Sequence, residues 1–378
     1  MSSLHYNAEH EAFRATLRRF VDQEVSPFVD AWDEGESFPR SLYARAAEIG
    51  LLGLHFPEDL GGTPADPFYV LIVCEELARA GSGGLSAGLM SHGIALPPIA
   101  AVGSAELKAR VIPPVLRGEK IAALAITEPS GGSDVANLTT TARRDGDVYV
   151  VKGTKTFITS GIRADTYTVA VRTGGPGMGG ISLLVVEKGT PGLSTTPLKK
   201  MGWWASDTAT VYFDDCRVPA QNLVGEENQG FMAMMLNFNM ERLALAANAY
   251  GFARAAYEEA LAYAKERVTF GRPLIQRQVI RHKLVDLLTR LNATQAFLES
   301  VAHRMKIGES PVAEICMLKN FAVDTMELCA KEAVQILGGA GYLRGVKSER
   351  IYREVKVIAI GGGASEILKD LASRQLDW

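Results

Sequence analysis

The stretch Ala125-Ile126-Thr127-Glu128-Pro129-Ser130-Gly131-Gly132-Ser133-Asp134 decides how the chain is interpreted. An apolar segment, residues 121–126, ends abruptly at a hydroxyl and an acid, and two glycines then stand between hydroxyl and carboxylate side chains. Glycine lets the backbone approach a ligand closely, and exposed amides around it can surround a phosphate or a polar heterocycle. The same residues also favour a simple turn, so the stretch alone leaves both interpretations open.

Length and composition are those of an ordinary globular protein. A chain of 378 residues can bury a large core and has room for two or three domains. Forty basic residues against 43 acidic ones leave a net charge of −3, which argues against a nucleic-acid partner. The most apolar run, residues 93–103, is broken by two prolines, so no membrane span is predicted. The first residues do not resemble a secretion signal, and we expect a cytoplasmic protein. The scattered cysteines and histidines predict no metal site.

The spacing of apolar residues divides the chain into three domains. Residues 1–119 are predicted to be helical, with helical periodicity from residue 7 to about 118. Residues 120–227 change to a period of two and predict a β domain, with a tight hairpin at Asp145-Gly146 and strands at 166–171, 181–186 and 209–213. Residues 228–378 return to helical spacing. Long amphipathic segments predict a four-helix bundle, at 228–268, 276–306, 312–337 and 347–376.

Five blocks along the chain resemble the signatures of the acyl-CoA dehydrogenase family, in the family's order. The opening stretch resembles Thr-Glu-Pro-x-x-Gly-Ser-Asp, and the other four blocks are 157–161, Glu266-Arg267-x-x-Phe270-Gly271, Gln335-x-x-Gly338-Gly339-x-Gly341, and 360–367. The resemblance covers essentially the whole chain. It implies a mainly α protein with an N-terminal helical domain, a middle β-barrel-like domain and a C-terminal four-helix bundle. It also implies a flavoprotein that desaturates acyl-CoA thioesters. The flavin and the thioester would bind between the last two domains.

The implied desaturation reaction requires a cofactor. Desaturation beside a thioester carbonyl needs a base, a hydride acceptor and donors that polarise the carbonyl, and no side chain accepts hydride well. The resemblance implies FAD. It assigns flavin contacts within one chain to Ile126, Thr127, Gly132, Ser133, Phe157 and Thr159. From the residues alone, Phe157 could equally be a core aromatic on a strand.

A second group of flavin contacts is implied across a subunit interface. The resemblance places there Arg267, Phe270, Gln278, Gln335 and Gly339, and it places Glu366 near the ribityl or adenosine portion of the flavin. A guanidinium such as that of Arg267 suits a pyrophosphate, although the glycines at 338–341 could simply end a helix. If these contacts cross an interface, one chain cannot hold FAD properly. The resemblance then implies a homotetramer, or dimer of dimers.

The base stands at a displaced position. Many family members carry a glutamate just before Gly-Thr in the last block, but here Gly362 stands at that position and offers no proton acceptor. In a subset that includes isovaleryl-CoA and long-chain acyl-CoA dehydrogenases, the base comes from the first long bundle helix, as Glu followed by Arg. Glu241-Arg242 matches that pattern, and its apolar neighbours predict a raised pKa for Glu241. The alternative is an ordinary solvated glutamate on an amphipathic helix.

The resemblance also implies substrate contacts and partners. It assigns contacts with the acyl-CoA to Ser133, Phe238, Asn239, Arg242 and Gly362, whose amide would donate to the thioester carbonyl. Asn239 and Trp204 depart from the aspartate and arginine that relatives often have, and Trp204 is expected to widen or dry the loop beside the CoA entrance. Electrons would pass to electron-transfer flavoprotein. Two alternatives stay open: a flavin-dependent acyl-CoA oxidase on the same scaffold, or a catalytically inactive acyl-CoA-binding homologue.

Overall fold

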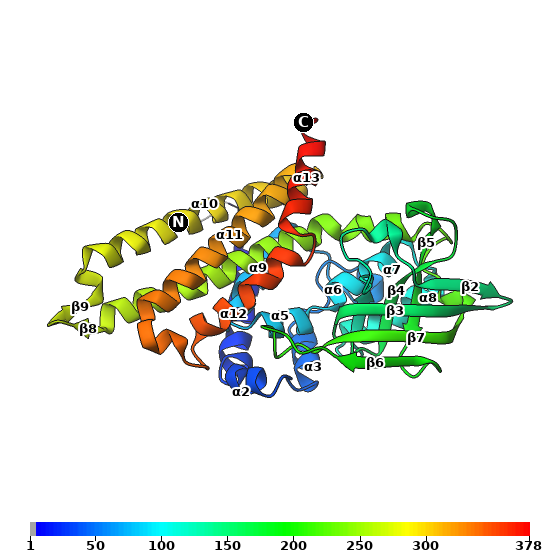
Figure 1. Ribbon diagram of the computed structural model, residues 1–378, viewed down its shortest axis with the longest axis horizontal. Helices are drawn as coiled ribbons and strands as arrows, with labels where there is room; N and C mark the ends of the chain where they lie inside the picture. Colours follow the sequence, from blue (N-terminus) through cyan, green and yellow to red (C-terminus); the bar gives the residue numbers. More distant parts are fainter. Residues whose placement is uncertain (1–4) are drawn as a thin grey trace.

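The computed structural model describes residues 5–378, in which helices, a β sheet and a second set of helices follow one another along the chain (Figure 1). The sheet lies at one end of the long axis, the long helices lie at the other, and α5 and α6 lie between them. This order confirms the predicted fold class. Residues 1–4 of the predicted first domain lie outside the described residues.

The N-terminal part consists of short helices, as the apolar spacing predicts. They are α1 (Ala8–Phe20), α2 (Val29–Glu34), α3 (Ser41–Glu48), α4 (Pro67–Ala78), α5 (Gly83–Leu89), α6 (His92–Ala95), α7 (Pro97–Val102) and α8 (Ala105–Leu116). Polar side chains cap several of them; Asp66, for example, accepts the amide proton of Phe68 at the start of α4. Within residues 5–378 no single helix is long and apolar enough to cross a bilayer, although Gly83–Leu89 and His92–Val102, bent by 50°, pass this test as a pair.

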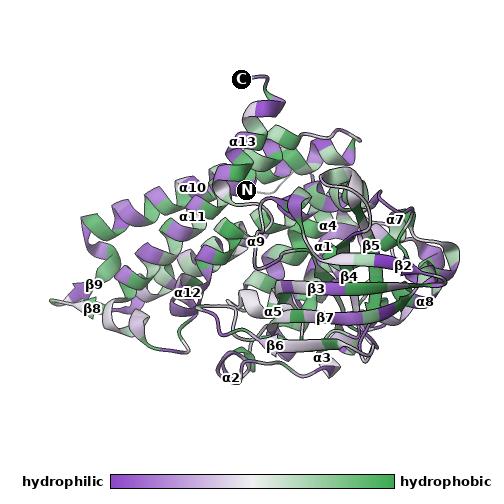
Figure 2. Ribbon diagram, turned by 45° about the vertical axis from the view of Figure 1, so that its right-hand side comes forward, coloured by the Kyte–Doolittle hydropathy of each residue, from purple (hydrophilic) through white to green (hydrophobic). Residues whose placement is uncertain are grey.

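The middle part is a seven-stranded sheet in the order β1-β4-β2-β3-β7-β6, with β5 paired to β4. The predicted hairpin is present, because Asp145 pairs with Val148 across a two-residue turn. β4 and β5 are buried almost throughout, and green, apolar residues are prominent in this part of the sheet (Figure 2). The strands are β1 (Ala122–Ala125), β2 (Thr141–Asp145), β3 (Val148–Thr159), β4 (Thr166–Arg172), β5 (Ile181–Glu187), β6 (Leu193–Pro197) and β7 (Thr208–Pro219).

The C-terminal part is a bundle around the 37-residue helix α9, whose buried face is rich in alanine and so allows close helix packing. The prediction of one helix over 347–376 is wrong. The chain breaks at 361–364, where Gly362 and Gly363 have φ of 65° and 104°, values that an α-helix does not allow. The elements are α9 (Gly230–Glu266), β8 (Val268–Thr269), β9 (Arg272–Pro273), α10 (Gln278–Lys306), α11 (Val312–Leu337), α12 (Lys347–Ile360) and α13 (Ser365–Gln375).

One buried carboxylate joins the three parts. Glu354 of α12 is 2% exposed; its Oε2 accepts the amide proton of Gly83 at 2.7 Å, and its Oε1 accepts that of Trp203 at 2.9 Å. Gly83 begins α5, and Trp203 lies in the loop before β7. A side chain at Gly83 would collide with the indole of Trp203, so glycine is needed for this approach. Burial raises the pKa of Glu354 to about 7.

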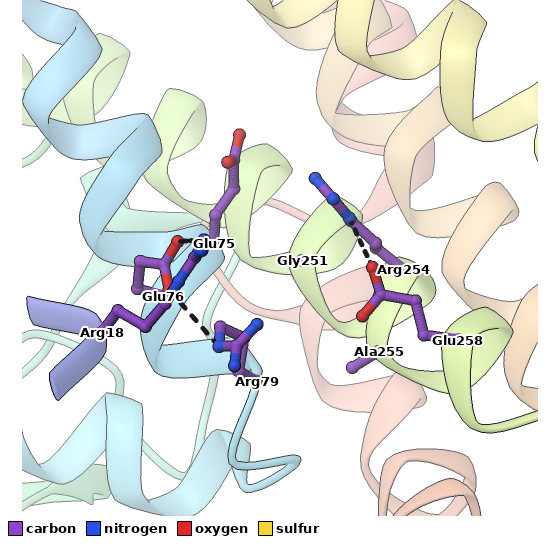
Figure 3. A pocket seen from close by; sticks show the side chains of 8 residues that line it. All are labelled: Arg18, Glu75, Glu76, Arg79, Gly251, Arg254, Ala255 and Glu258. Carbon is purple, nitrogen blue, oxygen red and sulfur yellow. Dashed lines mark hydrogen bonds and ion pairs between the residues drawn. The ribbon is translucent and has the colours of Figure 1, made fainter. Parts of the chain in front are cut away.

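A cluster of charged side chains lines a small pocket between α4 and α9 (Figure 3). The buried carboxylate of Glu76 accepts a hydrogen bond of 2.7 Å from Arg18 and pairs with Arg79 at 3.4 Å. Across from it on α9, Arg254 donates to Glu258 at 2.9 Å. Because Arg18 belongs to α1, the cluster also ties α1 to α4.

Replacing Glu354 tests the central joint. Glu354→Ala leaves two buried amides without an acceptor, and we expect the free energy of unfolding to fall by about 2–4 kcal/mol. Urea unfolding followed by circular dichroism measures this change. Lys356→Ala is the matched control on the same helix, because it removes only an exposed ion pair with Glu327, worth less than about 1 kcal/mol. Equal losses in the two variants would contradict a special role for Glu354.

Candidate active site

The stretch 125–134 leaves β1 as a loop that is supported by a buried ion pair. Lys155 of β3 is fully buried and donates to Oε1 of Glu128 at 2.8 Å and to the carbonyl of Ile126 at 2.9 Å. The carboxylate of Glu128 also accepts the amide protons of Thr139 at 2.6 Å and Thr140 at 2.8 Å. Burial alone would raise the pKa of Glu128, but Lys155 and these donors hold it well below its usual range. The base of the loop is therefore rigid.

The tip of this loop is a tight turn, as the glycines allow. Glu128 and Gly131 exchange two backbone hydrogen bonds, both of 3.1 Å. Gly132 lies against Thr127: a Cβ at Gly132 would be 3.4 Å from the methyl carbon of Thr127. Gly132 and Ser133 are exposed, and within residues 5–378 their amides donate to no backbone carbonyl. The two sequence interpretations are thus compatible, because the turn leaves these donors free for a ligand.

Phe157 lies beside the loop and points outward. The β3–β7 register shifts between Lys155 and Ile158, and Phe157 at this bulge has φ of 58° and is 69% exposed. The interpretation of Phe157 as a core aromatic is therefore wrong. The preceding residue, Thr156, donates its amide proton to the carbonyl of Thr127 at 2.8 Å, which joins bulge and loop. All six residues assigned to flavin contacts within one chain thus lie on this loop and the adjoining end of β3: Ile126, Thr127, Gly132, Ser133, Phe157 and Thr159.

The two positions considered for the base lie next to each other. A Cβ placed on Gly362, in the linker between α12 and α13, would be 3.6 Å from Oε1 of Glu241 on α9. It would also collide with Cδ1 of Leu245, so the leucine occupies the space that a side chain at 362 would need. Burial raises the pKa of Glu241 to about 6, against the opposing effect of the nearby positive charges of Arg242 and Lys319. Glu241 is therefore not an ordinary solvated glutamate.

The other residues assigned to the substrate surround Glu241 on α9. The guanidinium carbon of Arg242 lies 5.4 Å from the centre of the Phe238 ring. Nε of Arg242 is buried and has no hydrogen-bond partner within residues 5–378. Asn239 donates from Nδ2 to the hydroxyl of Ser310 at 3.0 Å, in the loop between α10 and α11. Asn239 thus connects α9 to the loop between α10 and α11.

Sequence reasoning missed Lys319 of α11. This lysine is fully buried and donates to the carbonyl of Gly363 at 2.9 Å. The next residue, Asn320, donates to the carbonyl of Ser365 at 3.0 Å. A sequence signal existed, because Lys319 stands between Leu318 and Ala322, both on the buried face of an amphipathic helix. A lysine in such a row is rarely buried without a specific role.

The residues assigned to the subunit interface do not join the loop within one chain. They lie at the end of the bundle remote from the sheet, around the β8–β9 hairpin (Figure 1), and all are partly or well exposed: Arg267, Phe270, Gln278, Gln335 and Gly339. Phe270, at the hairpin tip, is 98% exposed. Glu366 is exposed in the first turn of α13.

Trp204 contacts two arginines of the C-terminal part of the chain. Its ring lies between the guanidinium groups of Arg344 and Arg353, whose central carbons are 4.5 Å and 3.8 Å from the ring centre. Its indole N–H donates to the carbonyl of Lys200 at 3.0 Å. Both arginines follow α11 in the chain, so Trp204 attaches the sheet domain to the bundle, next to the Trp203–Glu354 hydrogen bond.

Comparison with known proteins identifies an oxidoreductase acting on CH–CH bonds. Three family models match successive parts of the chain: the N-terminal domain of acyl-CoA dehydrogenase at residues 7–119, the middle domain at 123–216 and the C-terminal domain at 228–376. The chain therefore belongs to the acyl-CoA dehydrogenase family.

Individual relatives match over nearly the full length. The chain is 37% identical over 365 residues to a 3-(aryl)acrylate reductase of Clostridium sporogenes, covering 96% of this chain and 97% of the relative. The crystal structure of a putative acyl-CoA dehydrogenase from Mycobacterium smegmatis matches with a TM-score of 0.97 and 47% identity, covering 99% of each chain. A glutaryl-CoA dehydrogenase from the same organism, solved in complex with FADH2, matches with a TM-score of 0.91 and 27% identity, covering 98% of this chain and 95% of the other.

The crowding at Gly362 can be tested by substitution. Gly362→Ala places a side chain at φ of 65° and against Leu245, and we expect it to lower the free energy of unfolding by about 1–3 kcal/mol. Adding Leu245→Ala should cancel the steric part of the effect in a double-mutant cycle. Gly361→Ala is the control, because Gly361 has an ordinary φ of −71°. Strict additivity of the two substitutions would show that the side chains do not meet.

Proposed function

We propose that the protein catalyses the FAD-dependent α,β-dehydrogenation of an acyl-CoA thioester to the trans-2-enoyl-CoA, with Glu241 as the base that removes the α-proton. The observation that carries the proposal is the proximity of Glu241 to Gly362. Oε1 of Glu241 is 3.6 Å from the position that a Cβ on residue 362 would occupy. A carboxylate on α9 therefore reaches the region that a carboxylate carried by residue 362 of the linker would occupy.

Glu241 has the properties that this role requires. A carboxylate in water has a pKa of about 4.3 and is a weak base, whereas burial brings the pKa of Glu241 to about 6. A base with a pKa close to the working pH combines a large ionised fraction with useful proton affinity. Within residues 5–378, Glu241 forms no ion pair shorter than 4.0 Å, so no cation neutralises it directly.

The loop after β1 and the bulge in β3 suit one face of a flavin. The exposed ring of Phe157 offers an aromatic surface, and the hydroxyl of Thr127 and the amides of Gly132 and Ser133 offer polar contacts around it. When bound, FAD would supply the hydride acceptor that no side chain provides. The relative solved with FADH2 supports a flavin at this fold.

Residues on α9 and in the linker would hold the thioester. The unpaired Nε of Arg242 is a buried donor available for the CoA side of the substrate, and the ring of Phe238 fixes its guanidinium. Ser133 and Asn239 would contact the remainder of the CoA. The amide of Gly362 would donate to the thioester carbonyl and so make the α-proton more acidic. Nothing in this arrangement selects a particular acyl chain.

The proposed FAD site is completed by a second chain. Arg267 and Phe270 flank and form the tip of the β8–β9 hairpin, which lies at the opposite end of the molecule from the sheet whose β1 precedes Thr127 (Figure 1), so both groups can contact one FAD only across an interface. Together with the family resemblance, this separation supports a homotetramer, or dimer of dimers. We also propose three domains: a helical domain at 1–119, a β domain at 120–227 and a helical bundle at 228–378.

The direction of the reaction depends on the electron partner. The group that removes the α-proton returns it in the reverse reaction, so the same Glu241 would serve a dehydrogenase or a reductase such as the Clostridium sporogenes relative. We propose electron-transfer flavoprotein as the acceptor. Rapid reoxidation of the reduced protein by air would favour the oxidase instead, and the absence of flavin bleaching with straight, branched and aromatic acyl-CoAs would favour the inactive homologue.

Substitution of Glu241 tests the base. Glu241→Gln keeps the size of the side chain but removes its proton affinity, and we expect flavin bleaching by an acyl-CoA to slow by a factor of about 10²–10⁴. Flavin content and oligomeric size should stay unchanged. The matched control is Glu258→Gln, which alters a half-exposed glutamate on the same helix. Full-rate flavin reduction by Glu241→Gln would refute the assignment.

The raised pKa of Glu241 predicts an acidic limb in the pH profile. A base acts only when ionised, so kcat/KM should increase tenfold per pH unit well below pH 6 and level off above it. Stopped-flow flavin reduction at subsaturating acyl-CoA between pH 4.5 and 8 measures the limb. A midpoint near pH 4, typical of an exposed glutamate, would contradict the buried environment.

A further inference from the structure

The linker between α12 and α13 depends on anchors from another helix. Residues 361–363 are three successive glycines, two of them with positive φ, and such a segment is intrinsically flexible. Two side chains of α11 hold it. The ammonium of Lys319 donates to the carbonyl of Gly363 at 2.9 Å, and the amide of Asn320 donates to the carbonyl of Ser365 at 3.0 Å. Both side chains are buried.

The two anchors differ in charge, because Lys319 carries an ammonium and Asn320 a neutral amide. An amide such as that of Asn320 would be sufficient to bind a carbonyl, whereas burying an ammonium is costly unless a negative charge compensates it. Within residues 5–378, no carboxylate lies within 4.0 Å of Nζ of Lys319. The carboxylates that act on it at longer range are Glu241 and Glu366. The anchor nearest to Gly362 is therefore also a positive charge that interacts with Glu241 at longer range.

We propose, on the basis of the proposed base role of Glu241, that Lys319 is a positioning residue with two effects on the site. Its hydrogen bond to Gly363 fixes the linker so that Gly362 stays against the carboxylate of Glu241. Its charge favours the ionised form of that carboxylate. Lys319 thereby places the Gly362 amide and sets the proton affinity of the base without touching the reacting atoms.

The charges around the pair are few. Glu241 interacts with Arg242 on α9 and with Lys319 on α11, while Lys319 interacts with Arg242, Cys316 of its own helix, Glu241, and Glu366 on α13. Burial lowers the pKa of Lys319 to about 8, and Arg242 adds to this effect. Lys319 is therefore mainly protonated at neutral pH, where its charge limits how far burial raises the pKa of Glu241.

The test compares loss of the charge with loss of an anchor alone. Lys319→Met removes both the charge and the hydrogen bond, whereas Asn320→Ala removes only the neighbouring anchor. Lys331→Met, at an exposed lysine of α11, is the control for removing a charge from this helix. The flavin-loaded protein is titrated without substrate, and the carboxylic-acid stretch of Glu241 is followed by infrared difference spectroscopy against Glu241→Gln. Hydrogen exchange of the peptide 357–368 is measured by mass spectrometry.

Lys319→Met should raise the pKa of Glu241 by about one unit and speed exchange at 361–365 by about tenfold. Asn320→Ala should speed exchange and leave the pKa of Glu241 unchanged, and Lys331→Met should change neither. Lys319→Arg, which retains the charge, should keep the pKa close to that of the unaltered protein. If the methionine variant does not accumulate, Lys319→Gln provides the same loss of charge.

An unchanged pKa of Glu241 in Lys319→Met or Lys319→Gln would overturn the electrostatic effect, and unchanged exchange would overturn the anchoring effect. Neither readout uses turnover, so both stand apart from the test of the base. If Glu241→Gln reduces flavin at full rate, the base assignment fails, while the titration still reports whether Lys319 controls the charge of Glu241.

Discussion

The hydrogen bonds from the amides of Gly83 and Trp203 to the buried carboxylate of Glu354 fix the three parts of the molecule relative to one another. The same helix that carries Glu354 ends just before the linker that holds Gly362. Any movement of α12 away from α5 and from the sheet would therefore also move Gly362 relative to Glu241. The geometry of the site therefore depends on hydrogen bonds outside it, which join Glu354 to the amides of Gly83 and Trp203. Residue 83 must be glycine, because a side chain there would collide with Trp203.

Two buried carboxylates show how environment separates a structural role from a chemical one. Glu128 has an ammonium and two backbone amides around it, and these hold its pKa well below the usual range, so it stays ionised as a support for the loop. Glu241 is shielded from water less completely than Glu128 and has positive charge only at longer range, and burial raises its pKa to about 6. Residue type is the same in both cases. The number of direct donors decides which carboxylate can exchange a proton near neutral pH.

Much of this architecture follows from local sequence patterns, because long periodic segments report burial directly. The helix over 312–337 and the strands at 166–171 and 181–186 are of this kind. Features set by contacts between distant segments were missed. The break at 361–364 depends on backbone angles that the apolar spacing hides, and the outward turn of Phe157 depends on a bulge against β7. Lys319 and Trp204 acquire their roles from partners in distant segments, which the sequence pattern around them does not identify.

The adjacency of Glu241 and Gly362 has a consequence for how such enzymes diverge. A chain carrying glutamates at both positions would hold two carboxylates close together, and such a pair shares a proton, so that only one of them is ionised. The doubly acidic ancestor would bear no more buried charge than either descendant. A catalytic group could therefore pass from the linker to the helix with one working base kept at each step, provided that position 245 gives up the space beside 362 that Leu245 fills here.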